Sequence, residues 1–204
     1  MKYFIFALWM SLLSSCANPI NEITYYRYLE TGSLAELRND PVLAEVAFNR
    51  ALANVYMGNL DKKIESQALF NLGRMERVNG KLDLSIEHLL KALRIDENLK
   101  PINNEHLIAD LSEIAKTYYE KNQYKEGSIY MDRIISIMES ITDKNVFTGK
   151  AKRFMNRLFL EYAEKIKQMG LDDKAKKYSE FARELKSYTN PTMVSRGRFT
   201  TCGF

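Results

Sequence analysis

The sequence predicts an all-α chain built from repeated pairs of antiparallel helices. Apolar and small residues recur three and four positions apart through most of residues 25–188, as along Leu82, Ile86, Leu89 and Leu93. No stretch sustains the alternation of apolar and polar residues that marks a half-buried strand. Residues that favour tight turns divide the helical run at similar intervals, which indicates repeated units instead of one long bundle.

The first fifteen residues have the layout of a secretory signal peptide. A short basic start at Lys2 precedes an almost wholly apolar run from Tyr3 to Leu13, and the small residues Ser14 and Ser15 follow. The apolar run is too short to cross a bilayer as a helix, because a spanning helix needs about 20 apolar residues. We therefore predict that residues 1–15 are a signal peptide.

The four residues Leu13 to Cys16, "LSSC", resemble the lipobox of bacterial lipoproteins. The resemblance implies cleavage before Cys16 and acylation of its thiol and of its new amino terminus. More than one acyl chain holds a protein stably on a membrane. Ala17 in place of Asp implies, by the same resemblance, an outer-membrane location facing the periplasm. Residues 16–24 would then be the lipidated cysteine and a tether, whereas the alternative is an ordinary signal that contains a cysteine.

Four segments share one spacing of small and turn-forming residues. A small residue precedes each turn residue by seven positions, and a second small residue follows the turn residue by five positions. The turn residues are Asn39, Gly80, Asn122 and Gly170, at intervals of 41, 42 and 48 residues. The flanking small residues are Gly32 and Ala44, Gly73 and Ser85, Ala115 and Gly127, and Ala163 and Ala175. Each segment is therefore expected to form a helix, a tight turn and a second helix.

Two glycines in the second unit illustrate this predicted helix–turn–helix arrangement. A glycine inside a helix costs about 1 kcal/mol relative to alanine. We expect Gly73 to let the two helices approach closely, opposite Ser85 and Ala92, and Gly80 to supply the turn. The first unit is less regular, since Ser33 to Glu36 has the pattern of a capping box that would restart the helix.

The spacing resembles the tetratricopeptide repeat (TPR), a helix–turn–helix unit of about 34 residues. The matching positions are Leu72-Gly73, Ala115 with Tyr118, Ala92 and Ala182. The resemblance implies TPR-like helical hairpins stacked as a short right-handed solenoid over residues 25–188. The implied units are 25–58, 66–99, 108–141 and 156–189, with a tail over residues 189–204. The motif's tryptophan and closing proline are absent, and the longer units require longer helices or loops such as Lys144 to Lys150.

TPR arrays bind segments of other proteins, mostly in a concave groove lined by the first helix of each pair. Carried onto this chain, the resemblance gives the groove candidates Gln67, Asn71, Arg74, Arg77, Ser112, Lys116 and Tyr119. Val78 and, in the last unit, Arg157, Glu161, Glu164 and Lys167 would lie on the same face. We expect Arg74, Arg77 and Lys116 to be exposed cations suited to an acidic peptide. The clamp that binds chaperone C-termini is not matched, because Ala109 and Glu113 stand where it needs basic residues.

The sequence holds no recognisable catalytic set. The two histidines, His88 and His106, lie in different helical segments, and no zinc-binding, phosphate-binding or nucleophile motif accompanies them. We therefore predict that the protein is not an enzyme and binds no metal or cofactor. An exported protein would also not meet nucleic acid, so we expect no nucleic-acid partner.

These observations predict a membrane-anchored TPR adaptor that binds envelope proteins or peptides. It would serve the assembly of pilus or secretion machinery, or dock envelope enzymes; the partner's identity is left open. The alternative is a structural or self-assembling envelope lipoprotein that stacks head to tail. Weak self-association is a possible feature of either function, with Cys202 as the thiol that could link copies.

Overall fold

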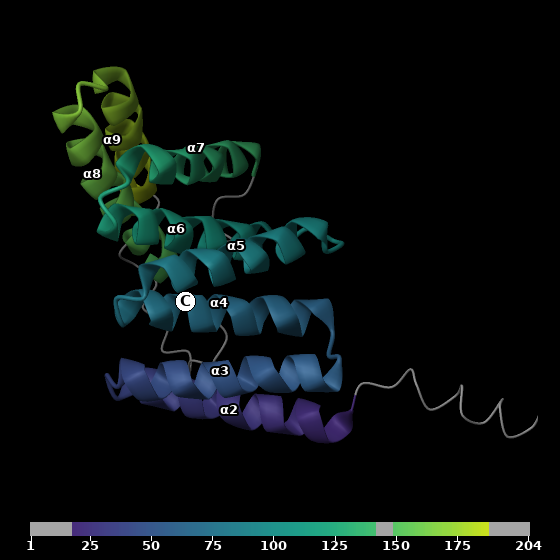
Figure 1. The fold of residues 1–204 in the computed structure, drawn as a ribbon. Helices are drawn as coiled ribbons and strands as arrows, with labels where there is room; N and C mark the ends of the chain where they lie inside the picture. Colours follow the sequence, from purple (N-terminus) through teal and green to yellow (C-terminus); the bar gives the residue numbers. More distant parts are fainter. Residues whose placement is uncertain (1–17, 142–148, 188–204) are drawn as a thin grey trace, which may run out of the picture.

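The computed structural model describes residues 18–141 and 149–187, and these residues form eight α-helices without a strand (Figure 1). The helices are α2 (Pro19–Leu37), α3 (Pro41–Gly58), α4 (Lys62–Val78), α5 (Leu82–Asn98), α6 (Asn104–Glu120), α7 (Tyr124–Ser140), α8 (Gly149–Gln168) and α9 (Asp172–Ser187). The predicted all-α class is confirmed. No helix among these residues is long and apolar enough to cross a membrane.

Consecutive helices form four hairpins, α2/α3, α4/α5, α6/α7 and α8/α9, which stack side by side (Figure 1). Each hairpin turns at the residue that the spacing marked. Backbone φ is +58° at Asn39, +76° at Gly80, +59° at Asn122 and +76° at Gly170. This left-handed conformation is one that glycine and asparagine adopt at the lowest cost. The four turn positions that the spacing predicts are therefore the turns of the four hairpins.

The close approach predicted at Gly73 is also present. A Cβ at Gly73 would lie 2.8 Å from Leu89 Cγ and 3.3 Å from the backbone oxygen of Ser85, both on α5. Ser85 is the expected neighbour, whereas Leu89 takes the place that we assigned to Ala92. Any side chain at position 73 would therefore push α4 and α5 apart.

The first hairpin is as regular as the others, which corrects two expectations. Helix α2 runs without interruption through Ser33, whose hydroxyl donates to the backbone oxygen of Leu29 (2.9 Å) and does not cap a new helix. The helix also begins earlier than predicted. Asn18 accepts a hydrogen bond from the Ile20 amide (3.1 Å) and Pro19 follows, so residues 19–24 belong to α2 and not to a tether.

The observed units extend over 19–58, 62–98, 104–140 and 149–187, so each is longer than the implied repeat. Most of the added length lies in the helices, because the connections at 59–61 and 99–103 are short. Asp61 and Asn103 cap the helices that follow these connections. The signal peptide, Cys16, most of the loop predicted before Lys150, and the tail with Cys202 lie outside the described residues.

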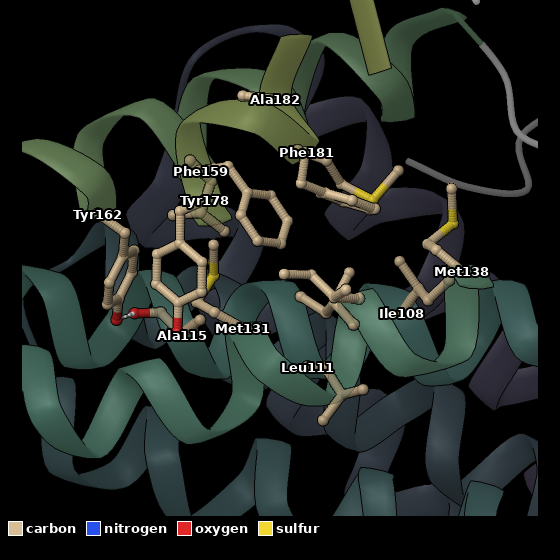
Figure 2. Packing of buried hydrophobic residues seen from close by; sticks show 14 of the residues in the cluster. Ile108, Leu111, Ala115, Met131, Met138, Phe159, Tyr162, Tyr178, Phe181 and Ala182 are labelled. Carbon is tan, nitrogen blue, oxygen red and sulfur yellow. Dashed lines mark hydrogen bonds between the residues drawn. The ribbon is translucent and has the colours of Figure 1, made fainter. Parts of the chain in front are cut away.

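Two apolar cores run between the hairpins, and the partly buried Phe70 packs against both of them. Figure 2 shows the carboxyl-terminal core, to which the last hairpin contributes Phe159 and Tyr178 and the preceding one Leu111 and Met131, all at most 1% exposed. The Tyr162 hydroxyl donates to the backbone oxygen of Ala115 across the same boundary. Because each hairpin buries its apolar face on its neighbours, the stack is stable only as an array.

Candidate binding groove on the first helices

Among the first helices of the last three hairpins, α6 contacts both α4 and α8. A cavity of about 250 Å³ lies between them. Its apolar wall is formed by Phe70 on α4, Ile108 and Ala109 on α6, and Ala151, Phe154 and Met155 on α8. Charged side chains also line it: Arg74, Glu105, Glu113 and Lys150. The cavity can therefore enclose an apolar group and hydrogen-bond a polar group beside it.

Two buried polar atoms on residues that line the cavity have no hydrogen-bond partner among the described residues. They are the hydroxyl oxygen of Ser112, a residue only 2% exposed, and Nε of Arg74. A buried polar atom without a partner costs about 1–3 kcal/mol. Such atoms are rare in folded proteins, and a bound water or ion is one explanation for them.

The cations expected to be free in the groove are paired instead, which corrects the expectation of an exposed basic surface. Arg74 forms a bidentate ion pair with Glu36 on α2, at 2.9 and 2.8 Å. Arg77 pairs with Glu113 (3.0 Å) and Glu120 (2.8 Å) on α6. Each of these arginines therefore joins α4 to the first helix of a neighbouring hairpin.

The same arrangement continues at Lys116, whose ammonium lies 2.7 Å from Glu161 on α8 and over the ring of Tyr119. The side chains of Arg74, Arg77 and Lys116 are only 20%, 15% and 21% exposed. Burial opposes the charge on Arg77, but Glu113 and Glu120 raise its pKa above the ordinary value. These ion pairs stabilise the stacking of the first helices and leave little free positive charge for an acidic ligand.

The remaining groove candidates also serve packing. Gln67 accepts a hydrogen bond from the Tyr25 hydroxyl on α2 (3.4 Å), and Asn71 is half-buried on α4. Tyr119 packs against Tyr124 and Tyr162, and burial raises its pKa. Of the seven candidates, Ser112 and Arg74 line the cavity.

In the last unit, the predicted face and the cavity use different parts of α8. Arg157, Glu164 and Lys167 are exposed and Glu161 pairs with Lys116, but none of the four lines the cavity. The cavity uses Lys150 to Met155 because α8 begins at Gly149, one to two turns before the start implied by the repeat. Two large aromatic residues on first helices, Phe70 and Phe154, are the sequence feature that points to this site. Neither is fully buried in the structure.

A second polar cluster lies between α5 and α6, outside the groove. Asp96 and Asp110 are 5% and 1% exposed, and His106 Nδ1 is 3.7 Å from the Asp96 carboxylate. Burial and the neighbouring Asp96 carboxylate hold the pKa of Asp110 well above its usual range. No group of three or more acidic, histidine or cysteine side chains in the described part of the chain could hold a metal ion.

No protein-family model and no curated protein sequence matches the chain. Solved structures do match it, with probability 1.00. The chain is similar to BtubC (BKLC) from P. vanneervenii, with a TM-score of 0.72 and 13% identity over 90% of this chain and 71% of that one. It is also similar to the putative kinesin light chain of Podosopora anserina, which has nearly identical TPR-like repeats. There the TM-score is 0.60 and the identity 16%, over 82% of this chain and 77% of that one.

A second crystal structure of the Podosopora anserina protein, a form with one methionine substitution, gives a TM-score of 0.61 and 16% identity, over 90% of this chain and 82% of that one. At these identities the likeness establishes the fold and nothing further. The chain therefore has a TPR-like fold of stacked helical hairpins, as the spacing of its small residues predicted.

Proposed function

We propose that the protein is an adaptor that binds an extended segment of another protein across α4, α6 and α8. TPR-like folds generally mediate protein–protein interaction. The observation that carries the proposal is the apolar cavity between α4, α6 and α8, whose lining residues include the polar Ser112 and Arg74. A rigid concave site of this kind holds one large apolar side chain and fixes its orientation by a few hydrogen bonds.

The chemistry of the wall defines the ligand. Phe70, Ile108 and Phe154 offer apolar contact to an aromatic or long aliphatic side chain. Arg74 and Ser112 set polar side chains beside this apolar wall, and a serine hydroxyl can donate or accept a hydrogen bond. An acidic peptide is a poorer ligand, because Glu105 and Glu113 also line the cavity and Arg74 is already paired with Glu36.

The location belongs to the same proposal. The signal-like residues 1–15 and the lipobox-like sequence before Cys16 support a lipid-anchored protein of the outer membrane that faces the periplasm. Its partners would be envelope proteins, either subunits of a pilus or secretion machine during assembly or envelope enzymes held at the membrane. The groove suits both kinds of partner, since each can present a segment with an exposed apolar side chain.

Selection from a library of random peptides, displayed on phage, tests the binding proposal. We expect the full-length chain to enrich peptides with one large apolar side chain and without a net negative charge. Ala109→Leu adds a side chain in the cavity wall and should weaken the selected peptides at least tenfold. Ala53→Leu makes the same change at an exposed position of α3 and should leave binding unaltered. Equal binding by both variants, or enrichment of acidic peptides alone, would contradict the proposal.

A further inference from the structure

The two ends of the helical stack have opposite surface chemistry. More than half of the large apolar side chains that are exposed in the described residues belong to α2 and α3, and none belongs to α9. Terminal units of a solenoid usually present a polar outer face to water. The α9 end follows this rule, whereas the α2 end, at the bottom of the stack in Figure 1, does not.

Four of the five exposed large apolar residues of α2, all but Tyr26, lie with Arg27 and Glu30 in a regular stripe on the side of the helix opposite Gly32, which packs on Phe48 of α3. We call this stripe the outer seam; it consists of Ile20, Ile23, Arg27, Glu30, Leu34 and Leu37, all exposed. Its residues are alternately three and four positions apart, the heptad spacing by which one helix pairs with another. Ile20 and Leu37, at its two ends, are 71% and 78% exposed.

The outer seam is complementary to the outer seam of a second copy when the two helices run antiparallel. An antiparallel copy that sets Ile20 opposite Leu37 also sets Ile23 opposite Leu34, and Arg27 opposite Glu30. Every apolar residue then meets an apolar residue, and the two central charges meet opposite charges. Neither Arg27 nor Glu30 forms an ion pair with another described residue, so both are available for such a contact.

We propose that the outer seam of α2 binds the outer seam of a second copy of this chain, antiparallel, about a two-fold axis between residues 28 and 29. A two-fold interface of this kind uses the same patch on both subunits. The two symmetric Arg27–Glu30 pairs at its centre fix the register, as charged or polar residues do within helical seams. The outer seam shares no residue with the cavity, so the dimer leaves the groove open and does not depend on the adaptor function.

Head-to-tail stacking is a weaker alternative for this surface. The opposite end of the stack presents α9, whose exposed residues include Lys176, Lys177, Glu180 and Arg183. A charged helix of this kind would bury unpaired charges against Ile20, Ile23, Leu34 and Leu37, which is costly. A closed dimer is therefore favoured over a growing filament.

The charge pair gives the proposal a specific test. Sedimentation equilibrium of the full-length protein in a density-matched non-ionic detergent should give two chains per particle. Arg27→Glu and Glu30→Arg, each alone, place like charges opposite each other and should weaken the dimer at least tenfold. The double variant Arg27→Glu/Glu30→Arg restores opposite charges and should restore the dimer. Arg183→Glu, the same charge change on α9, should have no effect.

Thermal melting followed by circular dichroism shows whether each variant is folded, and Ile23→Ser provides a second disruption without a charge change. A monomeric parent chain would overturn the proposal, including a monomer that instead binds vesicles through α2. A dimer that persists in both single variants would overturn it as well, because the interface would then lie elsewhere. Failure of the double variant to recover would exclude the antiparallel register.

Discussion

Arg77 Nε on α4 lies 3.0 Å from Glu113 Oε2 on α6, and the two side chains are only 15% and 12% exposed. The ion pair therefore joins two hairpins at a largely dehydrated position. Similar pairs join α2 to α4 through Glu36 and Arg74, and α6 to α8 through Lys116 and Glu161. Together they form a ladder of charges along the first helices, which holds the walls of the groove in place.

Removal of Arg77 tests the structural role of this ladder. Arg77→Ala leaves Glu113 without its cation and should lower the free energy of unfolding by about 1–3 kcal/mol, the range for leaving a buried polar group without its partner. Urea denaturation at neutral pH measures this change. Arg157→Ala removes an exposed arginine of α8 and should cost less than about 0.5 kcal/mol. Equal losses would show that the pair contributes nothing to stacking.

Gly73 tests the packing of the central hairpin. Gly73→Leu places a side chain where even a Cβ would lie 2.8 Å from Leu89 Cγ, so α4 and α5 must separate. Overpacking of this kind costs about 1–3 kcal/mol, and thermal melting should show a clear decrease in Tm. Lys91→Gln, a change in a surface pair with Glu87 on the same hairpin, is the control and should melt close to the parent.

The pH dependence of stability tests the buried carboxyl of Asp110. Its pKa is raised by burial and by Asp96, with Glu97 and Glu113 adding to the effect, and His106 faces the same cluster through Asp96. Between about pH 4, where an unfolded aspartate titrates, and the raised pKa, the folded chain holds a proton that the unfolded chain releases. The free energy of unfolding contributed by Asp110 should therefore fall as pH rises through this window.

Asp110→Asn cannot ionise, so its stability relative to the parent should increase as pH rises from about 4 to about 8. Urea denaturation at several pH values measures this difference. Asp173→Asn, at an exposed position at the start of α9, should follow the parent at every pH. If the curves of Asp110→Asn and the parent are parallel, Asp110 does not titrate differently in the folded state.

The proposed anchor is tested at Cys16. Cys16→Ser removes the thiol that would be acylated, so the protein should leave the membrane fraction or keep residues 1–15. Intact mass spectrometry of the parent protein should show a mature chain that starts at residue 16 and carries lipid. A parent chain of unmodified mass, with the same fractionation as the variant, would contradict the anchor.

Much of the fold could be predicted because turns and close contacts need particular residues. Asn39, Gly80, Asn122 and Gly170 were recognisable because a left-handed backbone excludes most side chains. Gly73 was recognisable because a helix rarely keeps a glycine without a reason. The regular first hairpin was harder to predict, since Ser33 satisfies its hydroxyl within the helix and only resembles a cap in sequence.

The groove was harder to predict for a different reason. The TPR resemblance predicts that Arg74, Arg77 and Lys116 share a face, but their partners lie 36 to 45 residues away in the chain, on other hairpins. No local pattern indicates that Glu36, Glu113 and Glu161 neutralise them. The cavity likewise depends on how three helices meet, which the sequence of any one helix does not determine.

The most direct test of the adaptor function is photo-crosslinking in living cells. Benzoyl-phenylalanine replaces Phe154, at the edge of the cavity on α8, or Ile129, which is 60% exposed on the second helix α7. We predict a discrete crosslinked partner from position 154 and none from position 129, with the crosslink lost when Ala109→Leu is added. A partner captured from position 129 and not from position 154 would contradict the assignment of the groove.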